Sequence, residues 1–228
     1  MNLILGIIFV VVLSYLVGSA NISYFFGKMR GYDIRKEGSG NAGASNVVIM
    51  MGKKWGLIVA IIDILKAFIV CTIAMKLFPD KVYMGPLAGV SCILGHIFPF
   101  YMQFKGGKGL ATLGGTILAL DPKLFVILLT ISIVMAIAVN YIIVVPMSMS
   151  LIFAVIFGYT RRSLVSFLIL MVAAVVMNIK HIENVKRIIA GTEARFSLLW
   201  DREGEAIRLK KTYDGGKGYD KVEERVNE

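Results

Sequence analysis

Residues 3–26 read LILGIIFVVVLSYLVGSANISYFF, a stretch that contains no Asp, Glu, Lys or Arg. About 20 apolar residues in a helix are enough to cross the hydrocarbon core of a bilayer. Comparable apolar runs follow at residues 55–78, 82–102, 110–120, 124–139, 141–159 and 164–179. The sequence therefore predicts an all-α fold, a polytopic integral membrane helical bundle of about seven transmembrane helices.

The composition supports the same class of protein. The chain of 228 residues is 57% hydrophobic and 18% charged, with a mean hydropathy of +0.75, which lies outside the usual range of soluble domains. Neither a basic segment before residue 3 nor a clear cleavage site marks the first run as a removed signal, so we expect it to remain as a helix.

The distribution of basic residues predicts the orientation of the helices. Most of the 25 lysines and arginines fall in the connections that lie on one side if the seven runs alternate in direction, and basic connections remain on the cytoplasmic side. This places the N-terminus outside and the C-terminus inside. We expect residues 1–196 to form the transmembrane domain and residues 197–228 to form a polar cytoplasmic tail.

The net charge of +10 is compatible with two kinds of partner, anionic lipid headgroups and anionic substrates. Nucleic acid is not an expected partner, because the basic residues do not alternate with aromatic residues in any soluble segment. Cys71 and Cys92 lie in apolar runs without metal-ligand spacing, which predicts packing roles and no metal site.

The first of three polar islands is GSGNAGASN, residues 38–46. Its glycines let backbone N–H groups turn into a shared hollow, and its serines and asparagines add neutral donors there. Such a hollow suits an anion, although an ordinary polar turn would have the same composition. Its candidate site residues are Ser39, Gly40, Asn41 and Asn46.

The second island is FKGGKGLAT, residues 104–112, which joins two apolar runs. It is not a nucleotide-binding P-loop, since Met102 occupies the place of the first glycine and Gly109 the place of the magnesium-binding Ser or Thr. Flexible backbone, two ammonium groups and a helix start can bind a phosphate; anchoring to lipid headgroups is the alternative. The candidates are Lys105, Gly106, Gly107, Lys108 and Gly109.

The third island is HIENVKRIIAGTEARF, residues 181–196. In a helix His181, Asn184 and Arg187 share one face, and Gly191 is suited to end the helix. His181 could exchange a hydrogen bond with a reacting group that Asn184 orients. An amphipathic helix end resting on the membrane surface is the alternative interpretation.

Three further polar residues lie inside the apolar runs. Asp63 and Lys66, three apart, predict an internal salt bridge, because an unpaired charge at membrane depth costs several kcal/mol. His96 is expected to support the lysine loop. The 110–120 run is too short to cross a bilayer alone, which predicts a tilted or broken helix beside a site.

The three islands resemble, in order and spacing, the signature motifs of the PlsY family, the bacterial acyl-phosphate:glycerol-3-phosphate acyltransferases. The similarity extends from about Gly18 to Glu193 and includes GHIFPFYMQFKGGKGLAT. It implies a seven-helix enzyme of the bacterial cytoplasmic membrane with its site at the cytoplasmic face. The implied reaction moves a fatty acyl chain from acyl phosphate to the 1-hydroxyl of glycerol 3-phosphate and gives lysophosphatidate.

The resemblance also implies roles for residues and partners. No cofactor and no metal are implied; the partners are acyl phosphate, glycerol 3-phosphate, membrane lipids and, as a further expectation, the enzyme that makes acyl phosphate. A substrate phosphate would accept the hydroxyl proton while His181 orients the reacting group. Carried over by position, the catalytic residues are Ser39, Lys108, His181 and Asn184, and the substrate-binding residues are Gly40, Asn41, Asn46, Lys105, Gly106, Gly107 and Gly109.

Three positions depart from the family pattern. Ile49 stands where the family has an arginine, Ile143 and its neighbours replace an arginine and a serine after Asn140, and Ala42 replaces a proline. Loss of a charge-assisted contact to phosphate costs about 1.5–3 kcal/mol. A diverged relative with another acceptor is therefore a second hypothesis. A transporter of a small organic anion is a third, although the chain shows no matching halves.

Overall fold

The computed structural model describes residues 2–201, 204–205 and 208. This part of the chain contains helices and no strand, which confirms the all-α prediction. The α-helices are α1 (Leu3–Ser19), α2 (Ile22–Met29), α3 (Ala44–Met51), α4 (Lys53–Leu77), α5 (Met84–Ile97), α6 (Leu110–Leu120), α7 (Pro122–Val139), α8 (Val144–Thr160) and α9 (Leu164–Ile189). Short 3-10 turns are η1 (Ile34–Lys36), η2 (Phe100–Met102) and η3 (Phe196–Leu199).

Every predicted apolar run is helical. Five segments of the described chain are long and apolar enough to cross a membrane, namely Leu3–Met29, Lys53–Leu77, Met84–Met102, Pro122–Val139 and Leu164–Ile189. The helices Leu110–Leu120 and Val144–Thr160 are apolar but shorter. The number of spans and the side on which each terminus lies remain predictions.

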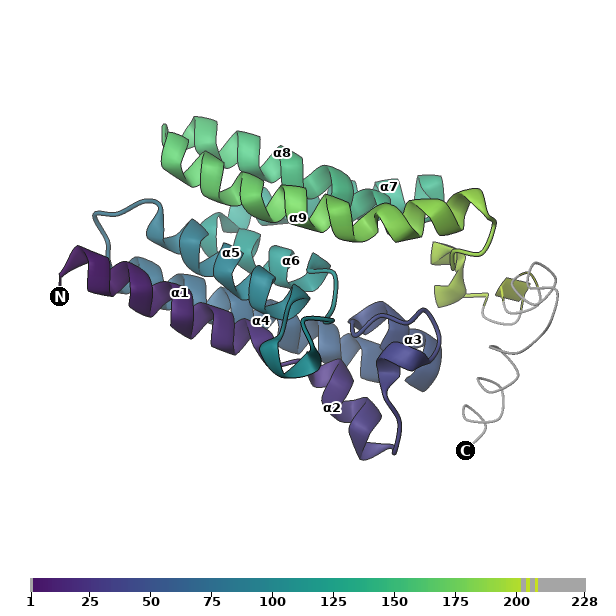
Figure 1. Cartoon of the computed structure of the whole chain (residues 1–228). Coiled ribbons are helices and arrows are strands. Elements are labelled where there is room, and N and C mark those ends of the chain that lie inside the picture. The colour runs from purple at the N-terminus through teal and green to yellow at the C-terminus, as the bar shows by residue number, and fades with distance from the viewer. Residues whose placement is uncertain (1, 202–203, 206–207, 209–228) are drawn as a thin grey trace.

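The helices form two packed groups. Helices α1, α4, α5 and α6 pack together, and the α8–α9 pair lies along α5 (Figure 1). Glycines permit the close crossings: a Cβ on Gly18 would lie 2.1 Å from the carbonyl oxygen of Cys92, and one on Gly95 would lie 2.2 Å from that of Tyr15. Small residues thus let the α1 and α5 backbones touch, as is usual between helices in membranes.

The first apolar run is broken near its end, which the sequence prediction of a single helix did not anticipate. Asn21 begins α2 by accepting a hydrogen bond from the Tyr24 N–H (2.9 Å). The carbonyls of Gly18 and Ala20 accept hydrogen bonds from the Lys66 Nζ at 2.9 and 3.0 Å. This satisfies backbone groups that a helix end leaves without partners at membrane depth.

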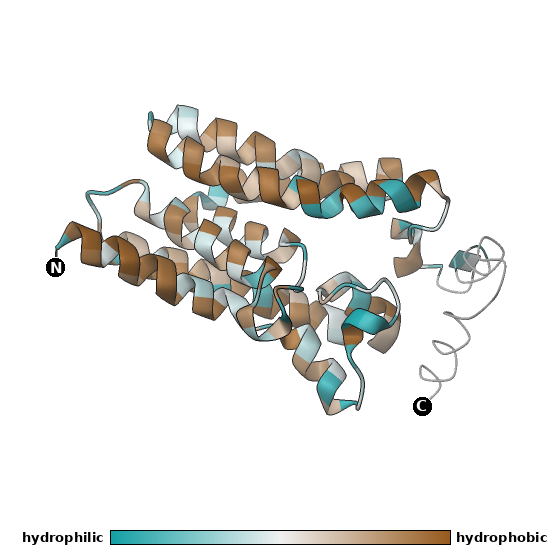
Figure 2. Ribbon diagram, in the orientation of Figure 1, coloured by the Kyte–Doolittle hydropathy of each residue, from teal (hydrophilic) through white to brown (hydrophobic). Residues whose placement is uncertain are grey.

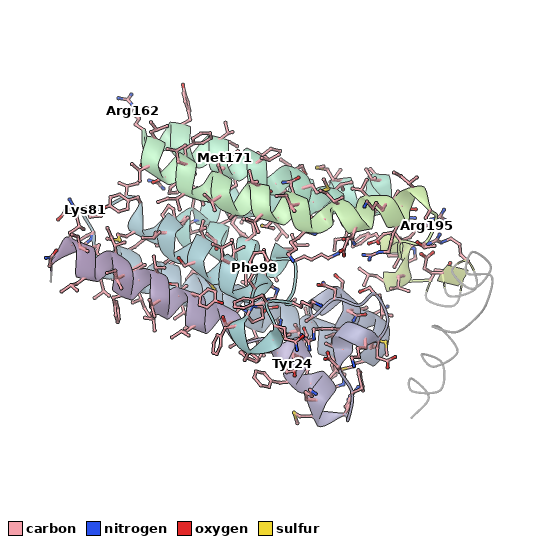
Figure 3. All side chains as sticks on the ribbon, in the orientation of Figure 1. Tyr24, Lys81, Phe98, Arg162, Met171 and Arg195 are labelled. Carbon is pink, nitrogen blue, oxygen red and sulfur yellow. The ribbon has the colours of Figure 1, made fainter. Side chains whose placement is uncertain are left out.

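Polar residues gather at one end of the bundle. Figure 2 shows apolar helices along the length of the molecule and hydrophilic positions where α3, the 103–109 loop and the C-terminal end of α9 meet. In Figure 3, Tyr24 and Arg195 mark this end, and Lys81 and Arg162 mark the opposite one. The three polar islands of the sequence are therefore brought to the same end of the protein. The tail predicted over residues 197–228 lies outside the described residues, except for residues 197–201, 204–205 and 208.

Candidate active site

The first island is shaped by a buried asparagine. Asn46 is fully buried, and its Oδ1 accepts a hydrogen bond from the Ser39 N–H (2.8 Å). Its Nδ2 donates to the carbonyls of Ile34 (2.9 Å) and Glu37 (3.0 Å). A side-chain amide committed to three backbone groups fixes the path of the loop. Asn46 therefore holds Ser39 in place, and direct contact between Asn46 and a substrate stays a prediction.

The glycines of this island adopt backbone conformations that other residues avoid. Gly38 and Gly40 have φ values of +56° and +72°, in the left-handed region where a Cβ is unfavourable. A side chain at Gly38 would also collide with the Asn46 amide, since its Cβ would lie 2.3 Å from Oδ1. Ser39 and Asn41 are half-buried and Gly40 is exposed, so this loop faces the end of the bundle.

The second island turns back on the helix before it. The N–H groups of Gly106 and Gly107 donate to the carbonyls of Ile97 and His96, both at 3.0 Å. These two amides are thus committed to the end of α5. The first amides of α6, which starts immediately after Gly109, are backbone donors suited to an anion.

His96 explains why two glycines occur here. A Cβ on Gly107 would lie 2.0 Å from His96 Nε2, and one on Gly106 would lie 2.1 Å from the His96 carbonyl oxygen. The prediction that His96 supports the lysine loop is confirmed by these contacts. The two glycines let the loop pack closely onto α5. This packing positions Lys108, the next residue of the loop, just before α6.

A buried charge cluster lies beneath this loop. Lys66 Nζ is 2.7 Å from Asp63 Oδ1, and the His96 Nδ1 lies 3.1 Å from the Lys66 Nζ and 3.5 Å from the Asp63 Oδ1. All three side chains are buried. The predicted salt bridge is confirmed. The pair also links α4 to the break between α1 and α2, through the bonds of Lys66, and to His96, on which the glycine loop packs.

The second and third islands meet through two side chains. The Nζ of Lys108 donates a hydrogen bond to Oδ1 of Asn184, on the final turns of α9. Asn184 Nδ2 donates to Glu193 Oε1 (2.6 Å), and Arg187 Nε donates to Glu193 Oε2 (2.7 Å). As predicted, α9 brings Asn184 and Arg187 to one face. Gly191, at φ +72°, follows the end of α9 at Ile189.

His181 lies one helical turn before Asn184 and is buried. Its Nδ1 is 2.7 Å from the Met177 carbonyl oxygen. Because a carbonyl can only accept, Nδ1 carries a proton, and Nε2 of the neutral ring is left as an acceptor. His181 is thus suited to accept a hydrogen bond from a substrate hydroxyl.

The environment of Lys108 alters its protonation. Burial disfavours the charged ammonium, and the nearby Arg187 adds repulsion, so that the pKa of Lys108 falls to about 8 although Glu193 opposes the shift. Lys105, in contrast, is exposed on the same loop. The two lysines that the sequence presents as similar therefore occupy different surroundings, and Lys108 is the one placed at the third island.

The islands have further points of contact. Arg35, held by Asp33 at 2.6 Å, donates to the Met102 carbonyl at 2.6 Å and so ties η1, before the first island, to η2, before the second. Lys180 lies 4.6 Å from the ring centre of Phe98, at the turn that leads into the loop. For Ser39, the hydrogen bond to Asn46 comes from its backbone, so a catalytic role for its hydroxyl stays a prediction.

The structure accounts for the positions that depart from the family pattern. Ile49 is 7% exposed and packs with Met50 against Ala194 and Leu198. Ile143 is 3% exposed at the start of α8. Ala42 is fully buried, and its carbonyl accepts a hydrogen bond from Asn21 Nδ2 (2.9 Å). Apolar packing thus replaces the charge expected at residue 49.

Glu193 lies in the third island, and the sequence pattern does not predict its role. Its position after the helix-ending Gly191 was the available signal, because a chain that reverses there can return a carboxylate to the face of α9. Across the described residues, His, Cys, Asp and Glu side chains form no group of three that could hold a metal ion.

The sequence matches the family model described as glycerol-3-phosphate acyltransferase over residues 8–191. A glycerol-3-phosphate acyltransferase of Aquifex aeolicus is 33% identical over 192 residues, which cover 83% of this chain and 98% of that protein. Glycerol-3-phosphate acyltransferase 1 of Oceanobacillus iheyensis is 36% identical over 199 residues, covering 84% and 95%.

Solved structures show the same similarity. The structure of PlsY, an integral membrane glycerol 3-phosphate acyltransferase, in its glycerol 3-phosphate form superimposes with a TM-score of 0.77 at 32% identity, covering 85% of this chain and 96% of that one. Its lysophosphatidic acid form gives a TM-score of 0.74 at 30% identity, covering 83% and 94%. The chain, an integral membrane helical protein with its polar islands at one end, belongs to the glycerol-3-phosphate acyltransferase family.

Proposed function

We propose that the protein transfers a fatty acyl group from acyl phosphate to the 1-hydroxyl of glycerol 3-phosphate and forms lysophosphatidate. The observation that carries this proposal is the contact between Lys108 and Asn184, which places a half-buried cation between the glycine loop and the His181 face of α9. The similarity to PlsY in its glycerol 3-phosphate and lysophosphatidic acid forms supports the acceptor and the product. The donor rests on the motif resemblance.

The site chemistry follows from the charges and the hydrogen bonds. The Lys108 ammonium and the first amides of α6 bind phosphate. His181 Nε2 accepts the hydrogen bond of the 1-hydroxyl and so orients its oxygen towards the acyl carbonyl carbon. A C–O ester bond forms as the bond between that carbon and the phosphate oxygen breaks. The hydroxyl proton, hydrogen-bonded to His181 before the attack, transfers to an oxygen of the departing phosphate and leaves with it. Both substrates are anionic, so positioning and charge stabilisation account for the rate acceleration.

Lipid synthesis by this route takes place at the bacterial cytoplasmic membrane, with the site at the cytoplasmic face. One substrate carries an acyl chain, which favours a site at the end of a membrane bundle. The basic connections next to the three islands favour the cytoplasmic side. A complex with the enzyme that makes acyl phosphate would deliver the donor at the same face.

A second candidate function is acylation of a different acceptor. Ile49 and Ile143 favour it, because these buried apolar side chains stand where the family pattern has polar or charged residues and cannot pair with the phosphate of glycerol 3-phosphate. Glycerol 3-phosphate remains our first choice because Lys108 and Arg187 supply positive charge near His181. The two candidates share the donor and differ in the acceptor.

The test is an assay of purified protein in lipid vesicles with labelled glycerol 3-phosphate. Palmitoyl phosphate and palmitoyl-CoA are supplied in parallel reactions, and the His181→Ala variant is the matched control. We expect labelled lysophosphatidate with palmitoyl phosphate alone, and little with the variant. Product with palmitoyl-CoA alone would overturn the donor assignment. Consumption of palmitoyl phosphate without labelled product, when glycerol or another polyol is acylated instead, would establish the second candidate.

A further inference from the structure

The chain reverses after α9 and returns across the polar end of the bundle. We call residues 192–201 the C-terminal strap; it includes η3 (Phe196–Leu199) and lies beyond residue 191, where the match to the family model ends. Figure 1 shows this segment beside the end of α9, near α3. The strap therefore lies next to the candidate site.

The middle of the strap is bound to the turn between α7 and α8. The Phe196 N–H donates to the Asn140 carbonyl and the Ser197 N–H donates to Asn140 Oδ1, both at 2.8 Å. Asn140 adopts φ +58°, a left-handed conformation that asparagine tolerates better than most residues. Its side chain thus acts as an acceptor for the backbone of another segment.

A second attachment joins the strap to α3. Ala194 and Leu198 pack against the buried side chains of Ile49 and Met50. A charged residue at position 49 would be buried in this cluster of apolar side chains, which is unfavourable. The strap is thereby held from α3 on one side and from the α7–α8 turn on the other.

Glu193 lies immediately before these attachments and is buried. Its carboxylate accepts from Asn184 Nδ2 (2.6 Å) and from Arg187 Nε (2.7 Å). A carboxylate can only accept, so it obliges the Asn184 amide to present its NH2 to Glu193 and its Oδ1 to Lys108. The orientation of Asn184 depends on Glu193, whose position is set by the bond of its N–H to the Arg187 carbonyl (3.2 Å) together with the docking of the strap that follows.

We propose that Asn140 is a positioning residue for acyl transfer, because it docks the C-terminal strap that places Glu193 against Asn184. The proposal rests on the proposed function, since acyl transfer is its readout. Release of the strap lets the Asn184 amide rotate and frees Lys108 from its oriented acceptor. The turnover number kcat falls more than the KM for glycerol 3-phosphate changes, because groups that must be aligned in the transition state are no longer held.

The structure supplies a matched set of substitutions. Asn140→Gly removes the side-chain acceptor of the Ser197 N–H, but keeps the left-handed backbone and the carbonyl that accepts from the Phe196 N–H. Asn140→Asp keeps an oxygen acceptor for the Ser197 N–H. Arg162 has φ +49° in the turn between α8 and α9 and is exposed at the opposite end of the bundle (Figure 3). Arg162→Gly is therefore a control for placing glycine in a left-handed turn. Leu198→Asp releases the strap independently from α3.

The experiment measures kcat and KM for lysophosphatidate formation in each variant, together with trypsin cleavage at the exposed Arg195. We expect Asn140→Gly to lower kcat about fivefold or more, with faster cleavage at Arg195. Leu198→Asp should have the same two effects. Asn140→Asp should restore most of kcat, and Arg162→Gly should match the unmutated protein.

Two results overturn the proposal. The first is faster cleavage at Arg195 with unchanged kcat, which would show that a released strap does not matter to transfer. The second is unchanged kcat and unchanged cleavage in both releasing variants, which would show that Asn140 and Leu198 do not hold the strap. Failure of the proposed function is distinct, because the unmutated protein would then form no lysophosphatidate.

Discussion

The Nζ of Lys108 donates a hydrogen bond to Oδ1 of Asn184, and this contact joins the glycine loop before α6 to the end of α9. Other contacts fix the position of each residue. Lys108 follows a loop that packs on His96, and Asn184 donates a hydrogen bond to Glu193. A cation and an amide are thus fixed beside His181 at one end of a membrane bundle. Catalysis by positioning requires such support, because a small displacement of a reacting group costs much of the rate.

The lowered pKa of Lys108 makes the activity depend on pH. Below its pKa of about 8 the free enzyme carries the ammonium that binds phosphate, and above that pH the neutral amine predominates. We therefore expect kcat/KM for glycerol 3-phosphate to fall as the pH rises through about 8, because kcat/KM reports ionisations of the free enzyme. Lys108→Arg, which stays charged, should move the fall to higher pH. A flat profile up to pH 9.5 in the unmutated protein would refute this role for Lys108.

Because Gly107 lies close to His96, adding one methyl group at position 107 should strongly reduce acyl transfer. Gly107→Ala places a Cβ 2.0 Å from His96 Nε2, and overpacking of this kind costs about 1–3 kcal/mol. If the loop moves to relieve the contact, transfer should fall by about 5- to 150-fold. The control is Gly114→Ala in α6, where the nearest atom to the added Cβ is 3.8 Å away. Equal activity in the two variants would contradict the account of the loop.

The buried Asp63–Lys66 pair should dominate stability in its region. Asp63→Asn leaves the Lys66 charge without its carboxylate, and breaking a buried pair costs about 3–5 kcal/mol. In a protein of this size we expect thermal unfolding in detergent to begin about 6–20 °C lower. Lys76→Met at the exposed end of α4 is the control and should shift unfolding little. Because Lys66→Met also removes the donor to the Gly18 and Ala20 carbonyls, the double variant Asp63→Asn, Lys66→Met should lose less stability than the sum of the two single variants. A loss equal to that sum would argue against the pairing.

Asn46 offers a test of how the first island is shaped. Asn46→Asp keeps the size of the side chain but replaces the NH2 that donates to the Ile34 and Glu37 carbonyls with an oxygen. A buried polar group left without its partner costs about 1–3 kcal/mol, so the loop that carries Ser39 should loosen. Hydrogen exchange over residues 34–46 should become faster and transfer should fall. Unchanged exchange would mean that Asn46 does not hold the loop.

Much of the fold could be predicted because hydropathy alone determines which segments are helices in a membrane. The seven apolar runs, the short 110–120 helix and the shared face of His181 and Asn184 are all local patterns. The break at Asn21 was missed, since a single asparagine in an apolar run is a weak signal. Its cause, the bonding of Lys66 to the carbonyls of Gly18 and Ala20, joins segments far apart in sequence.

The sequence predicts which residues form the candidate site, but not which of them contact one another. The islands identified Lys108, His181 and Asn184 because their residue types suit phosphate binding and hydroxyl orientation. The pairing of Lys108 with Asn184, and the binding of Glu193 to Asn184, depend on how α6, α9 and the strap meet. In the sequence, Ile49 is seen only as the replacement of an arginine of the family pattern. Leu198 packs against the cluster of Ile49 and Met50, but it lies in a segment that no local pattern connects to α3.

The most direct measurement compares the two lysines of the glycine loop. Lysophosphatidate formation from palmitoyl phosphate and labelled glycerol 3-phosphate is measured with the unmutated protein, Lys108→Ala and Lys105→Ala, each in lipid vesicles and confirmed as folded. We expect Lys108→Ala to lose transfer about a hundredfold or more, since a charge-assisted contact to the reacting phosphate is removed, while the exposed Lys105 contributes less. Full activity of Lys108→Ala, or a greater loss in Lys105→Ala, would contradict the site described here.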